Sequence, residues 1–162
     1  MAASTRKSFR GSERTASGSA IVPRPRDLAV LLVDADRAAR IPLAHRLSDR
    51  YAVYEAEDGL MALRLASMIP NLAVVLSEVT LPTLDGPDLA KVFRDHPLLK
   101  HIPFVFLSDR ASPNDALRLL AAGAHDVLKK SLAPQTIVRR VGKIARVGLP
   151  AEVPGSTTLL AR

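Results

Sequence analysis

Short runs of apolar residues recur along this chain and are separated by longer segments of mixed character. The runs are AVLLV at 29–33, LAVVL at 72–76, FVFL at 104–107 and DVL at 126–128. Because nearly every position in a run is apolar, the pattern predicts parallel strands that are covered on both faces. The segment YAVYEAE at 51–57 alternates more between apolar and polar residues, which predicts a strand at the edge of the sheet.

Helical features occupy the segments between these runs. Ser112 is a typical N-cap and is followed by proline in the first turn, and Gly123 stands where the same helix is expected to stop. In the last segment Ile137, Val141 and Ile144 follow an i, i+4, i+7 spacing, which predicts one buried stripe. Five strands alternating with five helices in about 120 residues predict an open, doubly wound α/β domain with a five-stranded parallel sheet.

Sheets of this type hold their ligand sites at the carboxyl ends of the strands, near the point where the strand order reverses. The polar residues that closely follow the apolar runs are Asp34, Asp36, Ser77, Glu78, Ser108, Asp109, Lys129 and Lys130. The sequence therefore predicts that carboxylates, a hydroxyl and a lysine converge on one edge of the sheet.

Composition narrows the class of protein. With 162 residues, of which 48% are hydrophobic, the chain suits one domain with a proper core. The absence of cysteine excludes disulfides, thiolate zinc sites and cysteine nucleophiles. No apolar run approaches the roughly 18 residues of a membrane span, and the N-terminus lacks the apolar core of a secretory signal. We therefore expect a soluble protein without a membrane span, located in the cytoplasm.

Most of the formal net charge of +7 lies near the N-terminus. Residues 1–26 hold six basic residues and one acid, whereas the remaining 136 residues hold 17 basic and 15 acidic residues. We predict a disordered basic tail rich in Ser and Arg at 1–26, a folded domain at 27–148 and a short C-terminal tail at 149–162. The basic tail is either a solvated leader with no specific partner, a segment that binds nucleic acid or anionic membrane, or an organelle transit peptide.

Five segments together resemble one known family. They are LLVDADRAAR at 31–40, YEAEDGLMAL at 54–63, VVLSEVTLPTLDG at 74–86, IPFVFLSD at 102–109 and AAGAHDVLKK at 121–130. In their order and spacing they resemble the receiver domain of two-component response regulators, over residues 27 to about 148. The resemblance implies a flavodoxin-like fold of the receiver type.

The resemblance also implies a phosphorylation site, in which an aspartate accepts phosphate, two acids hold Mg²⁺, and a lysine and a hydroxyl contact the phosphoryl group. Here the acceptor position is Glu78, the lysine is Lys130 and the switch hydroxyl is Ser108. A glutamate arm is one methylene longer, so its oxygens would lie about 1.5 Å from those of an aspartate. A misplacement of about this size costs about 100-fold in a positioned reaction.

The implied metal site is incomplete as well. The acidic pocket keeps Asp34, but Ala35 follows it, and Asp36 would have to swing in to replace the second acid. The remaining ligands would be Asp34, Glu78 and the backbone carbonyl of Thr80, for which we expect weak Mg²⁺ binding or none, and no other cofactor. Alternatively, Asp34 or Asp36 only caps the first helix, and Glu78 is only an ion-pair partner of the lysine.

Three further positions depart from what the resemblance implies or from regular helix geometry. Val127 stands where the family has an aromatic residue that moves together with the switch hydroxyl, so we expect that rotation to be lost. Lys130 is followed by Ser131 instead of proline, which favours a trans peptide and a repositioned lysine. Pro42 lies inside the first predicted helix, where it should remove one backbone hydrogen bond and kink the helix.

We interpret the chain as an atypical receiver, or pseudo-receiver, that acts as a protein-interaction module and not as an enzyme. Its expected partner is a signalling protein, such as a histidine kinase or a downstream regulator, and a homodimer through the last helix is a further expectation. In this interpretation Glu78 either imitates phosphoaspartate or merely neutralises Lys130. We expect no output domain after residue 148, so that any signal would leave through this domain or its tails.

Two alternatives remain open. The first is a working receiver that accepts phosphate on Glu78 from a histidine kinase or a small phosphodonor. The second is a nucleic-acid-associated regulator that uses the basic tail together with the basic face of the last helix, formed by Arg139, Lys143 and Arg146. That face is otherwise a solvated surface or a docking surface for an acidic protein.

Overall fold

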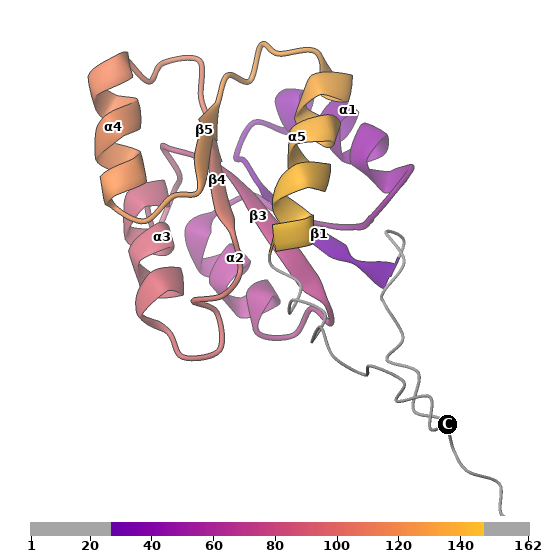
Figure 1. The fold of residues 1–162 in the computed structure, drawn as a ribbon, viewed down its shortest axis with the longest axis horizontal. Helices are drawn as coiled ribbons and strands as arrows, with labels where there is room; N and C mark the ends of the chain where they lie inside the picture. The colour runs from indigo at the N-terminus through magenta and orange to yellow at the C-terminus, as the bar shows by residue number, and fades with distance from the viewer. Residues whose placement is uncertain (1–26, 148–162) are drawn as a thin grey trace, which may run out of the picture.

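Five parallel strands form one sheet in the computed structural model, which describes residues 27–147 (Figure 1). The strands are β1 (Ala29–Val33), β2 (Ala52–Ala56), β3 (Leu72–Glu78), β4 (Phe104–Leu107) and β5 (Asp126–Leu128). The helices are α1 (Arg37–Ser48), α2 (Gly59–Ala66), α3 (Gly86–Asp95), α4 (Pro113–Ala121) and α5 (Pro134–Val147). Helices α1 and α5 cover one face of the sheet, and α2, α3 and α4 cover the other (Figure 1). The predicted open α/β sheet of five parallel strands is thus confirmed.

The strand order is β2-β1-β3-β4-β5, so the direction of winding reverses between β1 and β3. β2 lies at the edge of the sheet, as its alternating sequence predicted. At the switch point Val33 pairs with Ser77, which brings the residues after β1 next to the end of β3. This is the position at which sheets of this type bind ligands.

Burial explains why the apolar runs form these strands. Every residue of β1 and β4 is buried, as the continuous runs predicted. On the face covered by α3, Phe104 packs against Phe93 and Phe106, with ring centroids 5.4 and 5.1 Å apart. On the other face, Ile137 and Val141 of α5 are buried and Ile144 is partly buried, which confirms the predicted stripe.

Local signals set the helix ends. The Ser112 hydroxyl accepts a hydrogen bond from the backbone of Asp115, whose carboxylate accepts one from the Ser112 backbone, so that α4 begins with a capping box. Gly123 follows this helix with φ +111°, a conformation that favours glycine. Helix α1 continues through Pro42, although proline has no N–H to donate within the helix.

One boundary differs from the prediction at the place that matters most. The sequence predicted that the third strand ends at 76, but β3 continues to Glu78, because Ser77 and Glu78 pair with Phe106 and Leu107 of β4. Ser77 is fully buried in this extension. Glu78 is therefore held as the last residue of a strand and not as part of a loop.

Some predictions concern residues that lie outside the described part of the chain. These are the basic tail at 1–26, the C-terminal tail at 149–162 and the side chain of Arg146. Within the described part, Arg139 and Lys143 are exposed on α5. None of the helices from residue 27 to residue 147 combines the length and the apolar character that crossing a membrane requires.

Two glycines allow the loop after β3 to pack closely. A Cβ at Gly59 would collide with the carbonyl oxygen of Leu84. A Cβ at Gly86 would lie 2.5 Å from the carbonyl oxygen of Val79 and 2.7 Å from that of Glu78. The loop that follows the acceptor position is thus fixed by backbone contacts that tolerate no side chain at these two sites.

Replacing Gly59 by alanine is expected to lower the free energy of unfolding by about 2–3 kcal/mol, because the backbone of one of two packed loops must shift. Urea denaturation followed by circular dichroism measures the loss. The control is Gly142→Ala, whose Cβ would lie 3.3 Å from the Tyr51 hydroxyl. Alanine is a better helix former by about 1 kcal/mol, which offsets this contact. Equal losses in both variants would contradict the close packing at Gly59.

Candidate functional site

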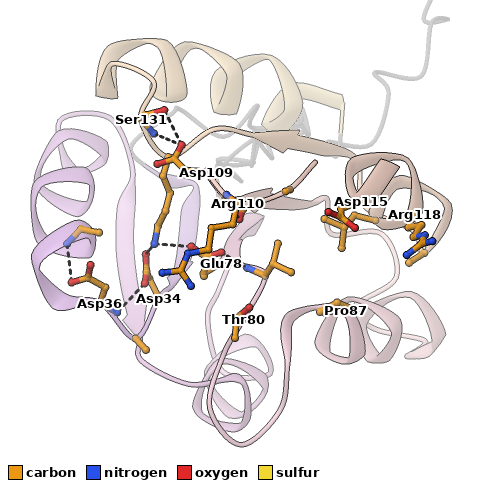
Figure 2. A pocket seen from close by; sticks show the side chains of 18 residues that line it. Asp34, Asp36, Glu78, Thr80, Pro87, Asp109, Arg110, Asp115, Arg118 and Ser131 are labelled. Atoms are coloured by element: carbon orange, nitrogen blue, oxygen red, sulfur yellow. Dashed lines mark hydrogen bonds and ion pairs between the residues drawn. The ribbon is translucent and has the colours of Figure 1, made fainter. Parts of the chain in front are cut away.

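An open cleft of about 1040 Å³ lies at the carboxyl edge of the sheet (Figure 2). Its walls come from the loops after β1, β3, β4 and β5 and from helix α4. The cleft contains the predicted site residues Asp34, Asp36, Glu78, Thr80, Ser108 and Lys130. The predicted convergence of carboxylates, a hydroxyl and a lysine is therefore confirmed.

Lys130 bridges the two central carboxylates of the cleft. Its Nζ lies 2.7 Å from Oδ2 of Asp34 and 2.7 Å from Oε2 of Glu78. The other oxygens are engaged by backbone N–H groups, Oδ1 of Asp34 by Asp36 at 2.9 Å and Oε1 of Glu78 by Val79 at 2.8 Å. All four carboxylate oxygens thus have a partner, and dashed lines in Figure 2 mark the interactions at Asp34 and Glu78.

The protonation of Lys130 follows from these contacts. Asp34 and Lys130 have side chains that are only 6% and 22% exposed. Burial by itself lowers the pKa of Lys130, but hydrogen bonds to Asp34 and Glu78 and the charges of both carboxylates outweigh it, so the pKa lies above its ordinary value of 10.5. The lysine is a cation throughout the physiological range.

The donor set does not fit a Mg²⁺ ion in this arrangement. Mg²⁺ requires near-octahedral coordination by oxygen ligands. The two carboxylates that would supply them already hold the ammonium group of Lys130. Within residues 27–147, no three or more His, Cys, Asp or Glu side chains are grouped in a way that could hold a metal ion.

Asp36 lines the cleft, but its side chain caps helix α1. Its Oδ1 accepts hydrogen bonds from the backbone N–H groups of Ala38 at 2.9 Å and Ala39 at 3.4 Å, so it is the N-cap of α1. This is the capping alternative that the sequence left open. Asp34, in contrast, pairs with Lys130 through its side chain.

The two positions associated with switching lie on neighbouring strands. Ser108 directly follows β4 and is 5% exposed, and its hydroxyl accepts a hydrogen bond from the backbone N–H of Arg110 at 3.3 Å. Val127 lies in β5, pairs with Phe106 and packs partly buried against the core. The short side chain of Val127 cannot rotate between the core and the surface as an aromatic side chain at this position would.

Ser131 fastens the loop after β5 to the loop after β4. Its backbone N–H and its hydroxyl both donate to Oδ1 of Asp109, at 2.9 and 2.8 Å. These two hydrogen bonds, above all the one from the backbone N–H, hold the pKa of Asp109 below its ordinary value of 3.8. The family resemblance implies proline at position 131. Proline has no N–H and no hydroxyl and would supply neither hydrogen bond. No peptide bond among the described residues is cis, which confirms the expected trans bond at Lys130.

Sequence reasoning missed two arginines. Arg40 of α1 donates to the backbone carbonyl of Asp34, and its Nε lies 2.9 Å from Oε2 of Glu55 on β2. Arg110 lines the cleft two residues after Ser108. The sequence could have pointed to Arg110, because it follows the apolar run at 104–107 as closely as Asp36 follows the run at 29–33. Arg40 lies within a helix and left no such signal.

Comparison with known proteins agrees with this geometry. The model of the response regulator receiver domain family matches residues 30–142. Two-component response regulator ORR3 of Oryza sativa is 32% identical over 124 residues, which is 76% of this chain and 94% of that protein. Response regulator MprA of a Mycobacterium species is 36% identical over 80% of this chain, and the match spans 56% of MprA.

Solved structures give the same result. The chemotaxis response regulator CheY4 of Vibrio cholerae has a TM-score of 0.66 and 29% identity, with coverage of 72% of this chain and 98% of that structure. Receiver domains act in signal transduction, typically through contacts with histidine kinases or downstream regulators. With a family match over residues 30–142, a five-stranded parallel sheet in the order 2-1-3-4-5 and an acid-lysine site at its carboxyl edge, the chain belongs to the receiver-domain family of two-component response regulators.

Proposed function

We propose that this protein is a pseudo-receiver, a protein-interaction module in signal transduction that keeps the receiver scaffold but does not accept phosphate in the usual way. The observation that carries the proposal is the contact of one ammonium group with both central carboxylates, at 2.7 Å each. In this role the protein is not an enzyme and needs no metal ion.

The state of Glu78 argues against phosphoryl transfer. A nucleophilic oxygen must be free to approach phosphorus in line with the leaving group. One oxygen of Glu78 faces Lys130 and the other accepts the N–H of Val79. Attack by either oxygen would break a short contact, and the longer glutamate arm also changes the direction of approach.

The charge around Glu78 argues in the same direction. In phosphoryl transfer a bound metal ion neutralises the charge that the phosphodonor brings. Here Asp34 and Glu78 are two acidic side chains, and among residues 27–147 Lys130 is the one cation that forms an ion pair with either of them. A phosphodonor would therefore meet a site with a surplus of negative charge and no fitting set of metal ligands.

The contacts of Glu78 also support a fixed conformation. An input can shift a two-state equilibrium only if it binds the two states with different affinity. The carboxylate of Glu78 engages Lys130 and a backbone N–H, which are donors that a phosphoryl group on a shorter aspartate would also use. We infer that Glu78 imitates the phosphorylated residue and that the partner, a histidine kinase or a downstream regulator, reads this permanent state.

Incubation of the protein with acetyl phosphate and Mg²⁺ is expected to leave its intact mass unchanged, because both oxygens of Glu78 are engaged. Mass spectrometry would detect a phosphoryl adduct as a gain of about 80 Da. The matched control is the double variant Ala35→Asp/Glu78→Asp, which restores an acidic pair and a shorter acceptor and is expected to gain the adduct. A base-labile adduct on Glu78 of the unaltered protein would overturn the proposal and favour a working receiver.

Lys130→Met is expected to lower the free energy of unfolding by about 2–3 kcal/mol, because it leaves two carboxylates of low exposure without their cation. Lys129→Met, at an exposed neighbour, should change it by less than about 0.5 kcal/mol. Because the pKa of Lys130 is raised, its contribution is fully present below pH 10.5 and is lost as the pH rises through the folded-state value. Chemical denaturation of both variants at several pH values measures these differences. If Lys130→Met lowered the free energy of unfolding by the same amount well above pH 10.5, the assigned role of the Lys130 charge would be contradicted.

Ser131→Pro is expected to raise the pKa of Asp109 towards its ordinary value of 3.8, because both hydrogen-bond donors disappear. NMR titration of the side-chain carboxyl carbons measures this. Asp58, whose pKa is lowered mainly by the N–H of Met61, is the internal control and should not change. A lowered pKa of Asp109 stabilises the folded protein at pH values above 3.8, and this stabilisation is lost as the pH falls through the folded-state pKa. Ser131→Pro should therefore lower the free energy of unfolding near neutral pH. An unchanged Asp109 would show that Ser131 does not set its pKa.

A further inference from the structure

The cleft is much larger than the ion cluster at its base. Its volume of about 1040 Å³ is at the upper end of the range typical of sites for small organic molecules, about 300–1000 Å³. The cluster of Asp34, Glu78 and Lys130 lies at the carboxyl ends of β1 and β3. The rest of the cleft extends to Pro87 of α3 and to helix α4 (Figure 2). This outer part has no role in the proposed ion-pair mechanism.

The outer part has apolar walls. Val79 and Pro87 line it from the β3–α3 side, and Leu119 and Ala122 line it from α4. Leu119 is 6% exposed, so it forms a firm wall and not a mobile surface group. Such walls suit the apolar body of a ligand, because burial of apolar surface is the general source of affinity in such pockets.

The acids of the cleft are all engaged. Each of the five is paired within the structure: Asp34 and Glu78 with Lys130, Asp36 with the first N–H groups of α1, Asp109 with Ser131, and Asp115 with Ser112. Among the charged groups that line the cleft, the side chains of Arg110 and Arg118 make no hydrogen bond or ion pair with any residue of the described range 27–147. Hydrogen bonds from Ser112 lower the pKa of Asp115 most, and the charge of Arg118, three residues later on the same helix, adds to this effect. Arg110, on the loop after β4, is therefore a cation that is available to a ligand.

The balance of charge selects the class of ligand. The lining holds five carboxylates and three cations, so a dianion such as phosphate would meet an excess of negative charge. A single negative charge is repelled less than a dianion, and on Arg110 it gains a guanidinium partner, which binds a planar carboxylate or a sulfonate well. In Figure 2 the side chain of Arg110 extends from the β4–α4 loop into the cleft, over the region of Glu78.

We propose that the cleft binds a small organic monoanion, with its charged group on Arg110 and its apolar body against Val79, Pro87, Leu119 and Ala122. This inference rests on the proposed function, in that the ion cluster stays closed and phosphoryl chemistry does not occupy the cleft. The bound molecule stabilises the folded protein by an amount that grows with the logarithm of its concentration once this exceeds the dissociation constant. It contacts α4 and the loop after β4, so its presence changes this part of the surface without phosphorylation and without opening the ion cluster.

The experiment is a fluorescence titration of the full chain with 8-anilinonaphthalene-1-sulfonate, an apolar body with one negative charge. The neutral dye N-phenyl-1-naphthylamine, which lacks the sulfonate, is the matched probe. We expect one equivalent of the anionic dye to bind, and Arg110→Ala to weaken it about tenfold through loss of one charged contact. The neutral dye should bind Arg110→Ala and the unaltered protein alike. Arg139→Ala, at an exposed arginine of α5 outside the cleft, should leave both affinities unchanged.

A second variant tests the apolar part independently. Ala122→Leu places a larger side chain in the cleft, and it should weaken both dyes while the circular dichroism spectrum stays the same. In ¹⁵N–¹H spectra the anionic dye should shift the amide signals of Ala111, Leu119 and Ala122. Equal effects of Arg110→Ala and Arg139→Ala, shifts confined to α1 and α5, or an absence of binding would each overturn the proposed site.

The titration contains neither Mg²⁺ nor a phosphodonor, so its result does not depend on phosphoryl transfer. A mass adduct on Glu78 would overturn the pseudo-receiver function even if the dye bound as expected. Dye binding that is independent of Arg110 would overturn the ligand site even if the mass stayed unchanged. The two proposals therefore fail separately.

Discussion

The contact of Lys130 with Asp34 and Glu78 is the interaction on which the rest of the site depends. The two carboxylates stand at the ends of adjacent strands, β1 and β3, where parallel pairing forces them together. Their repulsion would be costly at the low exposure that both have, unless a cation neutralised it. The cation comes from the end of β5, so the lysine must reach past β4.

The departures from the family pattern make sense as one set of contacts. The glutamate at position 78 is long enough to meet both the ammonium group and the N–H of Val79. Alanine at position 35 leaves Asp34 without an acidic residue directly after it, so Lys130 faces two central carboxylates and not three. Ser131 supplies two donors to Asp109, and these tie the lysine-bearing loop to the loop after β4. Glu78 and Ser131 each make a static contact, and in the proposed function these contacts replace phosphoryl chemistry.

The sequence predicted the fold well because its signals are local. Short continuous apolar runs are typical of strands buried on both faces, and the capping hydroxyl of Ser112 acts within one turn of its helix. It also predicted that Asp34, Glu78 and Lys130 meet, because the carboxyl ends of parallel strands share one edge. The end of β3 was wrong by two residues, since Ser77 and Glu78 are polar and only their pairing with β4 places them in the strand. The contacts of Arg40 with Glu55 and of Asp109 with Ser131 join residues 15 and 22 positions apart, and no periodicity in the sequence reports such pairs.

The bond between Asp109 and Ser131 has a consequence for association with other proteins. It joins the loops that lead into α4 and α5, so these two helices emerge from a connected support. A surface that is ordered before binding loses less conformational entropy when a partner docks, and its association does not wait for a rearrangement. For a partner that contacts these helices, occupancy then follows from the abundance of the two proteins. Synthesis and degradation of this chain would set the strength of its output, with a response as slow as protein turnover.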